Sequence, residues 1–150
     1  MIIAVIGGSN CPNKTIEELA FQTGVEIARR GHILICGGVS GVMEFACKGA
    51  KTVKGSITVG ILPGKTKQDA NPYVDIPVIT AMSHARNAII VRTADAVIAI
   101  DGKYGTLSEI ALAKVLDKPV YGIKTWDIEG VIPVSGPKEA LDEIEKNVVV

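Results

Sequence analysis

Aromatic residues are scarce in this sequence, and neither sign of charge is in excess. Phenylalanine, tryptophan and tyrosine make up 4% of its 150 residues, and 16 lysine and arginine residues balance 16 aspartate and glutamate residues. A chain without net charge has no long-range attraction for nucleic acids or anionic membranes, and few aromatic rings are available to stack on bases. We therefore expect neither nucleic acid nor a membrane as a partner.

Cysteines are also few, and their spacing argues against two kinds of structural site. Cys11, Cys36 and Cys47 are odd in number and form no C-x-x-C pair, which is untypical of a disulfide framework or a structural zinc site. No apolar run reaches the about 18 residues that a membrane span needs, and the start at Met1 lacks the basic region of a signal peptide. These absences predict a cytoplasmic protein without a metal site.

Short apolar runs alternate along the chain with segments of helical periodicity. The runs lack polar alternation, which is typical of strands covered on both faces. The expected strands are Ile2–Ile6, Ile33–Cys36, Ile57–Leu62, Asp95–Ile100 and Pro119–Ile123, with a short additional one at Val78–Thr80. The expected helices are Thr15–Arg30, Ser40–Lys51, Ser83–Thr93, Thr106–Leu116 and Pro137–Lys146.

Strands that alternate with helices through short connections predict βαβ units and right-handed crossovers. We therefore expect an α/β fold, a Rossmann-like doubly wound parallel sheet that forms a single three-layer domain over residues 1–150. The five main strands should lie in the order 3-2-1-4-5. Lys65–Pro77 is the one long loop that this interpretation leaves.

Ligands of such sheets bind beyond the carboxyl ends of the strands, where two glycine-rich loops stand out. Gly7, Gly8 and Ser9 follow the first strand, and they form either an anion-binding turn or a plain tight turn. Gly38, Ser40 and Gly41 follow the second strand and open a helix. The free amides and positive dipole end of such a turn suit a phosphate, although Ser40 could also be only the N-cap.

Two further loops carry charged residues at expected helix starts. With Ser83 as N-cap, Arg86 falls in the first helical turn, where its charge opposes the helix dipole and its planar fork suits a phosphate or a carboxylate. Gly102, Gly105, Thr106 and Glu109 lead from a strand into the next helix. Thr106-x-x-Glu109 also matches a capping box, so spacing does not separate a capping glutamate from a catalytic one.

Three of these motifs, in this order, resemble the LOG superfamily, long labelled lysine decarboxylase-like. They are Gly37–Glu44, Arg86-Asn87 and Gly102–Glu109, and the resemblance extends from Ile2 to about Lys146. It implies a Rossmann-type fold, an oligomer and a phosphate-bearing ligand. Characterised LOG enzymes hydrolyse the N-glycosidic bond of cytokinin nucleoside 5′-monophosphates, which implies catalytic roles for Arg86 and Glu109. It does not imply a lysine decarboxylase, because no lysine lies in a recognisable pyridoxal-phosphate context.

The sequence departs from the family motif P-G-G-x-G-T-x-x-E at two positions. Asp101 replaces its proline and Lys103 replaces its second glycine, and Asn87 replaces the lysine that usually follows the arginine. In length and in the run G-T-L-S-E-I-A, the chain is more similar to the short branch of the superfamily. That branch includes molybdenum-cofactor carrier proteins, which bind a pterin phosphate without chemistry.

Two functions therefore stay open. The first is binding of a nucleoside monophosphate or pterin phosphate, by a carrier in which Glu109 only caps its helix. The alternative is a LOG-type phosphoribohydrolase, in which Glu109 stabilises the developing oxocarbenium ion or positions water. Neither requires a cofactor beyond a bound nucleotide or molybdopterin-type ligand.

A homodimer or higher homo-oligomer is expected as well. The superfamily resemblance implies dimers through helices beside the site, and the two site helices carry more apolar surface than one sheet face needs. The residues concerned are Ala88, Ile89, Val91, Ala111, Leu112, Val115 and Leu116.

Overall fold

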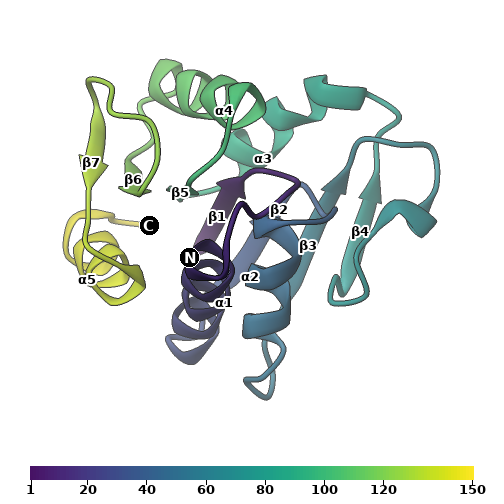
Figure 1. Cartoon of the computed structure of the whole chain (residues 1–150), viewed down its shortest axis with the longest axis horizontal. Coiled ribbons are helices and arrows are strands. Elements are labelled where there is room, and N and C mark those ends of the chain that lie inside the picture. Colours follow the sequence, from purple (N-terminus) through teal and green to yellow (C-terminus); the bar gives the residue numbers. More distant parts are fainter.

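The apolar runs form the centre of a seven-stranded parallel sheet in a computed structural model that describes residues 1–150 (Figure 1). The strand order is β4-β3-β2-β1-β5-β6-β7. The strands are β1 (Ile2–Gly7), β2 (Ile33–Cys36), β3 (Thr58–Leu62), β4 (Ile76–Ile79), β5 (Ala96–Ile100), β6 (Val120–Ile123) and β7 (Val131–Pro133). The helices are α1 (Lys14–Arg29), α2 (Val42–Ala50), α3 (Asn87–Thr93), α4 (Tyr104–Val115) and α5 (Pro137–Asn147), with short 3-10 turns η1 (Lys67–Asp69) and η2 (Ser83–Arg86).

The central strands are buried on both faces, which makes the molecule three layers deep. Along β1, Ile3 and Val5 pack against α1, α2 and α5, whereas Ala4 and Ile6 pack against α3 and α4 on the opposite face. All four side chains are at most 1% exposed. A strand covered on both sides needs apolar residues at every position, which explains the absence of polar alternation.

The predicted α/β fold is confirmed, and so is the predicted strand order. The five predicted strands correspond to β3-β2-β1-β5-β6 in the sheet. The two edges differ from the prediction, since β4 starts two residues before the expected Val78 and β7 was not predicted. Both edge strands are partly exposed and contain a proline, which an edge tolerates because one side of it needs no ladder hydrogen bonds.

Two predicted helix starts are wrong, because each helix begins before the threonine that the sequence suggested as its first residue. The side chain of Asn13 accepts a hydrogen bond from the Ile16 amide at 3.0 Å, so α1 begins at Lys14 and Thr15 lies inside it. Helix α4 begins at Tyr104, which places Thr106 at its third residue. Glu109 therefore does not cap α4, and the explanation of this residue as a capping glutamate fails.

The expected helix Ser83–Thr93 is divided in two. Ser83 has a left-handed φ of 51° and starts the 3-10 turn η2, and α3 follows from Asn87. Ser83 is thus not the N-cap that the sequence suggested, and Arg86 itself occupies the cap position of α3.

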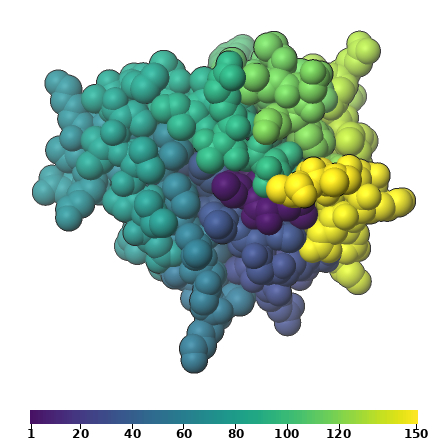
Figure 2. Space-filling view, turned by 180° about the vertical axis from the view of Figure 1, so that it is seen from behind, coloured from purple at the N-terminus to yellow at the C-terminus, as the bar shows by residue number.

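The two ends of the chain lie side by side, away from the long loop. The residues at the N-terminus border the C-terminal segment in the space-filling view (Figure 2), and Met1 and Val148 pack against the same core cluster. None of the helices combines the length and the apolar character that a membrane crossing requires.

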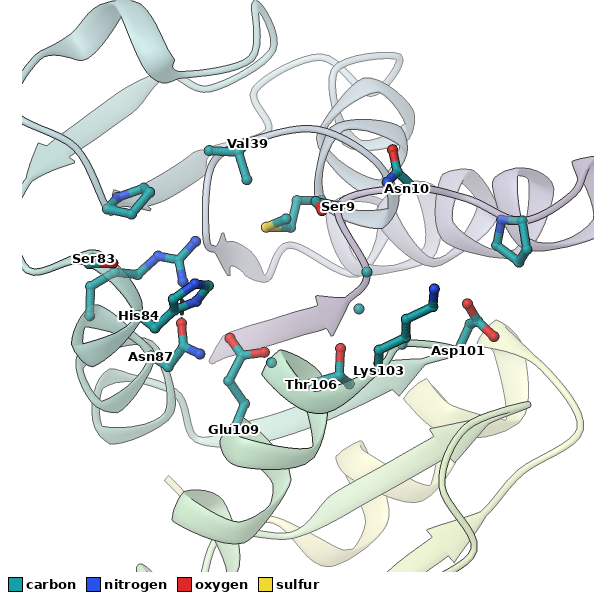
Figure 3. Close-up of a pocket in the computed structure, with 18 residues that line it drawn as sticks. Ser9, Asn10, Val39, Ser83, His84, Asn87, Asp101, Lys103, Thr106 and Glu109 are labelled. Atoms are coloured by element: carbon teal, nitrogen blue, oxygen red, sulfur yellow. Dashed lines mark hydrogen bonds between the residues drawn. The ribbon is translucent and has the colours of Figure 1, made fainter.

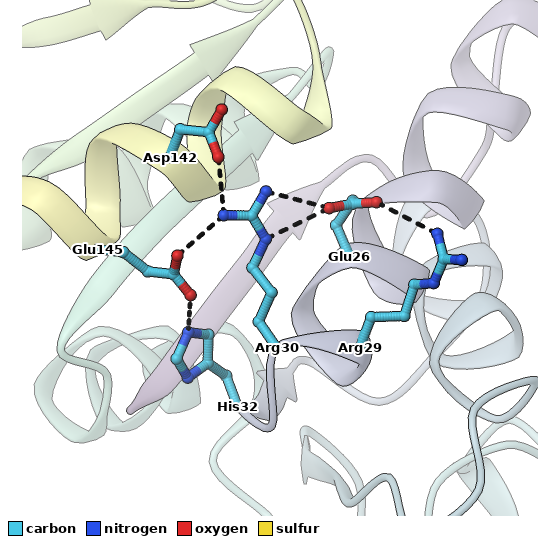
Figure 4. A network of polar contacts seen from close by, with 6 residues as sticks. All are labelled: Glu26, Arg29, Arg30, His32, Asp142 and Glu145. Atoms are coloured by element: carbon cyan, nitrogen blue, oxygen red, sulfur yellow. Dashed lines mark hydrogen bonds and ion pairs between the residues drawn. The ribbon is translucent and has the colours of Figure 1, made fainter.

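A network of charged side chains fastens α5 to α1 (Figure 4). Arg30 contacts Glu26 at 3.2 Å, Asp142 at 2.8 Å and Glu145 at 2.9 Å, and His32 contacts Glu145 at 3.0 Å. The Arg30 side chain is 18% exposed, so water screens these contacts less than it screens a surface pair. One guanidinium is thus shared by three carboxylates from two helices.

We expect Arg30→Ala to lower the free energy of unfolding by about 1–2 kcal/mol, because the three carboxylates then lose the cation that they share. Urea denaturation at neutral pH measures the change. Arg29→Ala is the matched control, since the Arg29 side chain is 68% exposed and reaches only Glu26, at 3.8 Å. Equal effects of the two substitutions would show that the network adds nothing to stability.

Candidate functional site

A cavity of about 550 Å³ opens at the carboxyl ends of the central strands (Figure 3). Its walls come from the loops after β1, β2, β3 and β5, from η2 and from the start of α4. The lining residues are Gly7, Gly8, Ser9, Asn10, Pro12, Val39, Met43, Pro63, Ser83, His84, Arg86, Asn87, Asp101, Gly102, Lys103, Gly105, Thr106 and Glu109. No group of three or more His, Cys, Asp and Glu side chains is arranged to hold a metal ion.

Eight of the predicted site residues line this cavity and three do not. Those brought together are Gly7, Gly8, Ser9, Arg86, Gly102, Gly105, Thr106 and Glu109, whereas Gly38, Ser40 and Gly41 lie outside the lining. The predicted residues thus converge on one edge of the sheet, but the loop after β2 contributes Val39 to the cavity wall and not its glycines or Ser40.

The loop after β2 is occupied by contacts with the rest of the chain. The Val42 amide donates to the Gly8 carbonyl at 3.0 Å, and the Ser40 hydroxyl donates to the Ser9 carbonyl at 2.8 Å. A Cβ on Gly41 would lie 2.3 Å from the Gly8 carbonyl oxygen, so this glycine is needed where the two loops touch. Gly41, not Ser40, is the N-cap of α2, and the loop after β1 closes that helix start.

The start of α4, in contrast, is open. No side chain caps this helix, and the first amide to find a helical acceptor is that of Leu107, which donates to the Lys103 carbonyl at 2.9 Å. The amides of Tyr104, Gly105 and Thr106 therefore have no acceptor within the helix. A Cβ on Gly105 would meet no atom within 4 Å, and Gly105 does not have a positive φ. Nothing in the protein requires a glycine here.

The turn that leads into α4 is held in an uncommon conformation. Asp101 and Gly102 both have left-handed φ values, 49° and 94°, and the Thr125 hydroxyl donates to the Asp101 carbonyl at 2.6 Å. A Cβ on Gly102 would lie 2.2 Å from Thr106 Oγ1, which is buried without a hydrogen-bond partner. Backbone strain of this kind is often found at functional sites, and Ser83, with a similar φ, lines the same cavity.

Arg86 is buried and largely committed to the protein. Its Nε donates to the Ile61 carbonyl at 2.8 Å, its Nη1 donates to Asn87 Oδ1, and its Nη2 approaches the Gly37 carbonyl at 3.4 Å. These contacts use three of its five N–H groups, and the residue is 7% exposed. The sequence suggested an arginine that waits for an anion. The structure instead has one that joins β3, the loop after β2 and α3.

Glu109 is the opposite case, a buried carboxyl without a partner. It is 7% exposed, it lies in the second turn of α4, and it points into the cavity (Figure 3). Burial raises its pKa to about 8, and the nearby Arg86 charge opposes this shift only in part. The Glu109 carboxyl is therefore largely protonated at neutral pH, and it can donate a hydrogen bond or a proton to a ligand in the cavity.

Asn87 is one of the lining residues that sequence reasoning did not select. Its side-chain oxygen accepts from Arg86, and its Nδ2 donates to the Ser108 hydroxyl at 3.2 Å, which links α3 to α4. Asp101 and Lys103 were noted only as departures from a family motif, although their position beside Gly102 was a usable signal. The apolar lining residues Val39, Met43 and Pro63 carried no such signal.

Known proteins resemble this chain in both sequence and structure. The SLOG cluster4 family matches residues 1–147. An uncharacterized protein of Archaeoglobus fulgidus is 46% identical over 143 residues, covering 95% of this chain and 93% of that protein. The structure of the molybdenum cofactor binding protein from the phototrophic bacterium Rippkaea orientalis superposes with a TM-score of 0.91. It is 36% identical, and the match covers 97% of this chain and 95% of that one.

A more distant relative is described as an enzyme. A probable cytokinin riboside 5′-monophosphate phosphoribohydrolase of Oryza sativa subsp. japonica is 32% identical over 130 residues. The match covers 79% of this chain but 57% of the rice protein, so the chain spans little more than half the length of that relative.

We expect Glu109→Gln to stabilise the protein at pH 7 by on the order of 1–3 kcal/mol, because it removes an acid whose ionised form is disfavoured by burial. The folded pKa of about 8 lies above the unfolded value of 4.5, so this acid costs nothing below pH 4.5. Its cost grows as the pH rises from there to about 8. The difference in unfolding free energy between variant and wild type should follow that curve in urea titrations.

Glu129→Gln is the control for this measurement, since it makes the same substitution at an exposed loop residue. It should alter the unfolding free energy by less than about 0.5 kcal/mol at any pH. A flat difference between Glu109→Gln and wild type from pH 5 to pH 8 would contradict the raised pKa.

Proposed function

This chain belongs to the SLOG cluster4 family, and from that premise we propose that its cavity binds a small molecule by a phosphate group and that the protein carries this molecule. The predicted resemblance to LOG proteins and to their carrier-like branch is confirmed by the family match and by the relatives. A nucleoside monophosphate or a pterin phosphate is the proposed ligand. The predicted cytoplasmic location remains a prediction.

The observation that carries this proposal is the open start of α4 beside Gly105. Three amides without helical acceptors and the positive end of a helix dipole are a preferred setting for a phosphate. The missing side chain of Gly105 leaves room for the phosphate oxygens to approach these amides. The loop of Gly8 and Ser9 lies across the cavity from α4, and Gly7 and Gly102 bring the strands and loops close enough to enclose the ligand.

Arg86 and Glu109 then lie deeper, beside the part of the ligand that follows the phosphate. Arg86 contributes charge and the two N–H hydrogens that the protein does not use. The protonated Glu109 carboxyl donates to a sugar, base or pterin acceptor. Ser40 and Gly41 support the loop after β1 from behind, and Gly38 packs against Gly60 and Leu62 of β3. In this proposal none of the three touches the ligand.

One observation favours hydrolysis of an N-glycosidic bond as a second candidate function. A protonated carboxyl without a partner is suited to protonate a departing base, while water adds to the sugar carbon. In this function Glu109 is the general acid and Arg86 orients the substrate. The carrier function ranks first because the Rippkaea orientalis protein matches nearly the whole chain, whereas the rice phosphoribohydrolase is nearly twice as long as its matched part.

We also propose a homo-oligomer, formed through the outer face of α4. Tyr104 is 80% exposed and Val115 is 79% exposed, and both lie on this helix. Val91 was expected to belong to the same apolar surface, but it is completely buried because α3 packs it against the sheet. The surface available for association is therefore smaller than the sequence suggested.

The test of the proposed function is incubation of the protein with adenosine 5′-monophosphate and a cytokinin riboside 5′-monophosphate. We expect a complex in native mass spectrometry and no free base in chromatography. Release of base by wild type, lost in Glu109→Gln while binding persists, would establish the hydrolase instead. Failure of the protein to bind either nucleotide or any co-purifying phosphate compound would refute both functions.

We expect Gly105→Ala to weaken binding of adenosine 5′-monophosphate by about tenfold or more, because its methyl group occupies the space in front of the α4 amides (about 1.4 kcal/mol per tenfold). The same substitution should leave the protein as stable or more stable, by up to about 1 kcal/mol, since alanine favours a helix over glycine. Calorimetric titration and urea denaturation measure the two effects.

Gly136→Ala is the matched control for Gly105→Ala. Gly136 also stands at a helix start, and a Cβ there would likewise meet no atom within 4 Å, but Gly136 lies outside the cavity lining. It should leave the affinity for the nucleotide unchanged. Normal binding by Gly105→Ala would mean that no ligand approaches α4 at this point.

A further inference from the structure

The charge of the cavity depends on few side chains, since the chain has no net charge to attract an anion from a distance. The ionisable lining residues are Arg86, Lys103, Asp101, Glu109 and His84. With histidine counted as neutral and the Glu109 carboxyl protonated because burial raises its pKa, one positive charge remains at pH 7. Without Lys103, Arg86 and Asp101 would cancel, and the cavity would have none.

Lys103 is also the one of the two cations that is free to move toward a ligand. Arg86 is buried and held by Ile61, Asn87 and Gly37, as described above. The Lys103 side chain is exposed and takes part in no hydrogen bond or ion pair, although Asp101 lies nearby in the same turn (Figure 3).

The backbone of Lys103, in contrast, is fixed. Its carbonyl accepts from Trp126 Nε1 at 3.1 Å and from the Leu107 amide at 2.9 Å. A rigid backbone with a free ammonium group places a mobile charge at a defined point, which is the cap position of α4.

The position of Lys103 is unfavourable unless an anion is bound. A cation at a helix N-terminus opposes the helix dipole, and this helix has no capping side chain to offset it. A second observation points to a ligand at the same place, since Thr106 lines the cavity, is 2% exposed, and has a buried hydroxyl without a hydrogen-bond partner. Both features are accounted for by an anionic group held in front of α4.

We propose that Lys103 is the specificity-determining residue of the cavity, and that its ammonium group selects ligands with a dianionic phosphate monoester over the corresponding uncharged compound. This inference rests on the proposed function. The helix amides hold the phosphate oxygens, and Lys103 closes over them from the solvent side. The LOG motif has a glycine at this position, which leaves the backbone open to the phosphate. Here the lysine side chain adds a positive charge next to the phosphate instead.

The experiment compares binding of adenosine 5′-monophosphate and adenosine to wild type, Lys103→Gln and Lys103→Arg by calorimetric titration at pH 7. Lys103→Gln should weaken binding of the monophosphate about tenfold and that of adenosine less than about twofold, the scale expected for loss of one charged hydrogen bond. Lys103→Arg should retain the affinity of wild type within about threefold, because it retains the charge.

The dependence of binding on ionic strength provides a second readout. A purely structural role of Lys103 would leave this dependence unchanged. Raising the salt from about 20 mM to about 300 mM should weaken binding of the monophosphate to wild type more than to Lys103→Gln. Lys54→Gln is the matched control, since Lys54 is also exposed and lies outside the cavity lining. It should leave both the affinity and the salt dependence as in wild type.

The outcomes separate this inference from the proposed function. If wild type binds the monophosphate and Lys103→Gln binds it equally well, the role of Lys103 is refuted and the binding function stands. If Lys54→Gln weakens binding as much as Lys103→Gln does, net charge and not position is responsible, and the inference also fails. If wild type binds neither the monophosphate nor inorganic phosphate nor pyrophosphate, the proposed function itself fails.

Discussion

The first amides of a helix have no acceptor inside the helix, and each must be satisfied from elsewhere. In α1 the Asn13 side chain fills this role, and in α2 the Gly8 carbonyl does. Helix α4 receives no such acceptor, even though its start borders a cavity rather than open solvent. The candidate site lies at this helix start because its free amides can donate hydrogen bonds to a ligand.

A second consequence of the same arrangement is the pairing of Arg86 with Glu109. Both residues are more than nine-tenths buried, yet they form no ion pair with each other. Each compensates for its burial in a different way. Arg86 keeps its charge and donates to two backbone carbonyls and the Asn87 side-chain oxygen, whereas Glu109 retains its proton. Burying an acid without a partner weakens the fold, so stability does not explain the residue, and this agrees with the role toward a ligand that we propose for it.

The fold was accessible from the sequence because it follows from features that act locally. The apolar runs of β1 and β5 and the helical periods between them predicted a parallel sheet. The edge strands β4 and β7 were harder, since half-exposed segments interrupted by Pro77 or Pro133 lack that pattern. The helix starts were misassigned for another reason. The sequence suggested Thr15 and Thr106 as the first residues of α1 and α4, but whether the residue before each helix is Asn13 or Lys103 depends on backbone geometry. Likewise, Gly41 and Gly105 are indistinguishable as letters, and only the neighbours of each backbone show that one is needed by the chain and the other is not.

The central strand β1 pairs with one strand that is synthesised early and with another that is synthesised late. Ile3 pairs with Leu34 on one side but with Ala96 on the other, so one edge of the first strand stays open until most of the chain exists. Contacts between such distant residues form late, because closing a long loop costs entropy before any pairing is gained. The cavity spans this seam, with Gly8 on the early side and Gly105 on the late side. A molecule bound there would hold the two halves of the sheet together and shift the folding equilibrium toward the folded state as its concentration rises, so that a ligand would also assist folding.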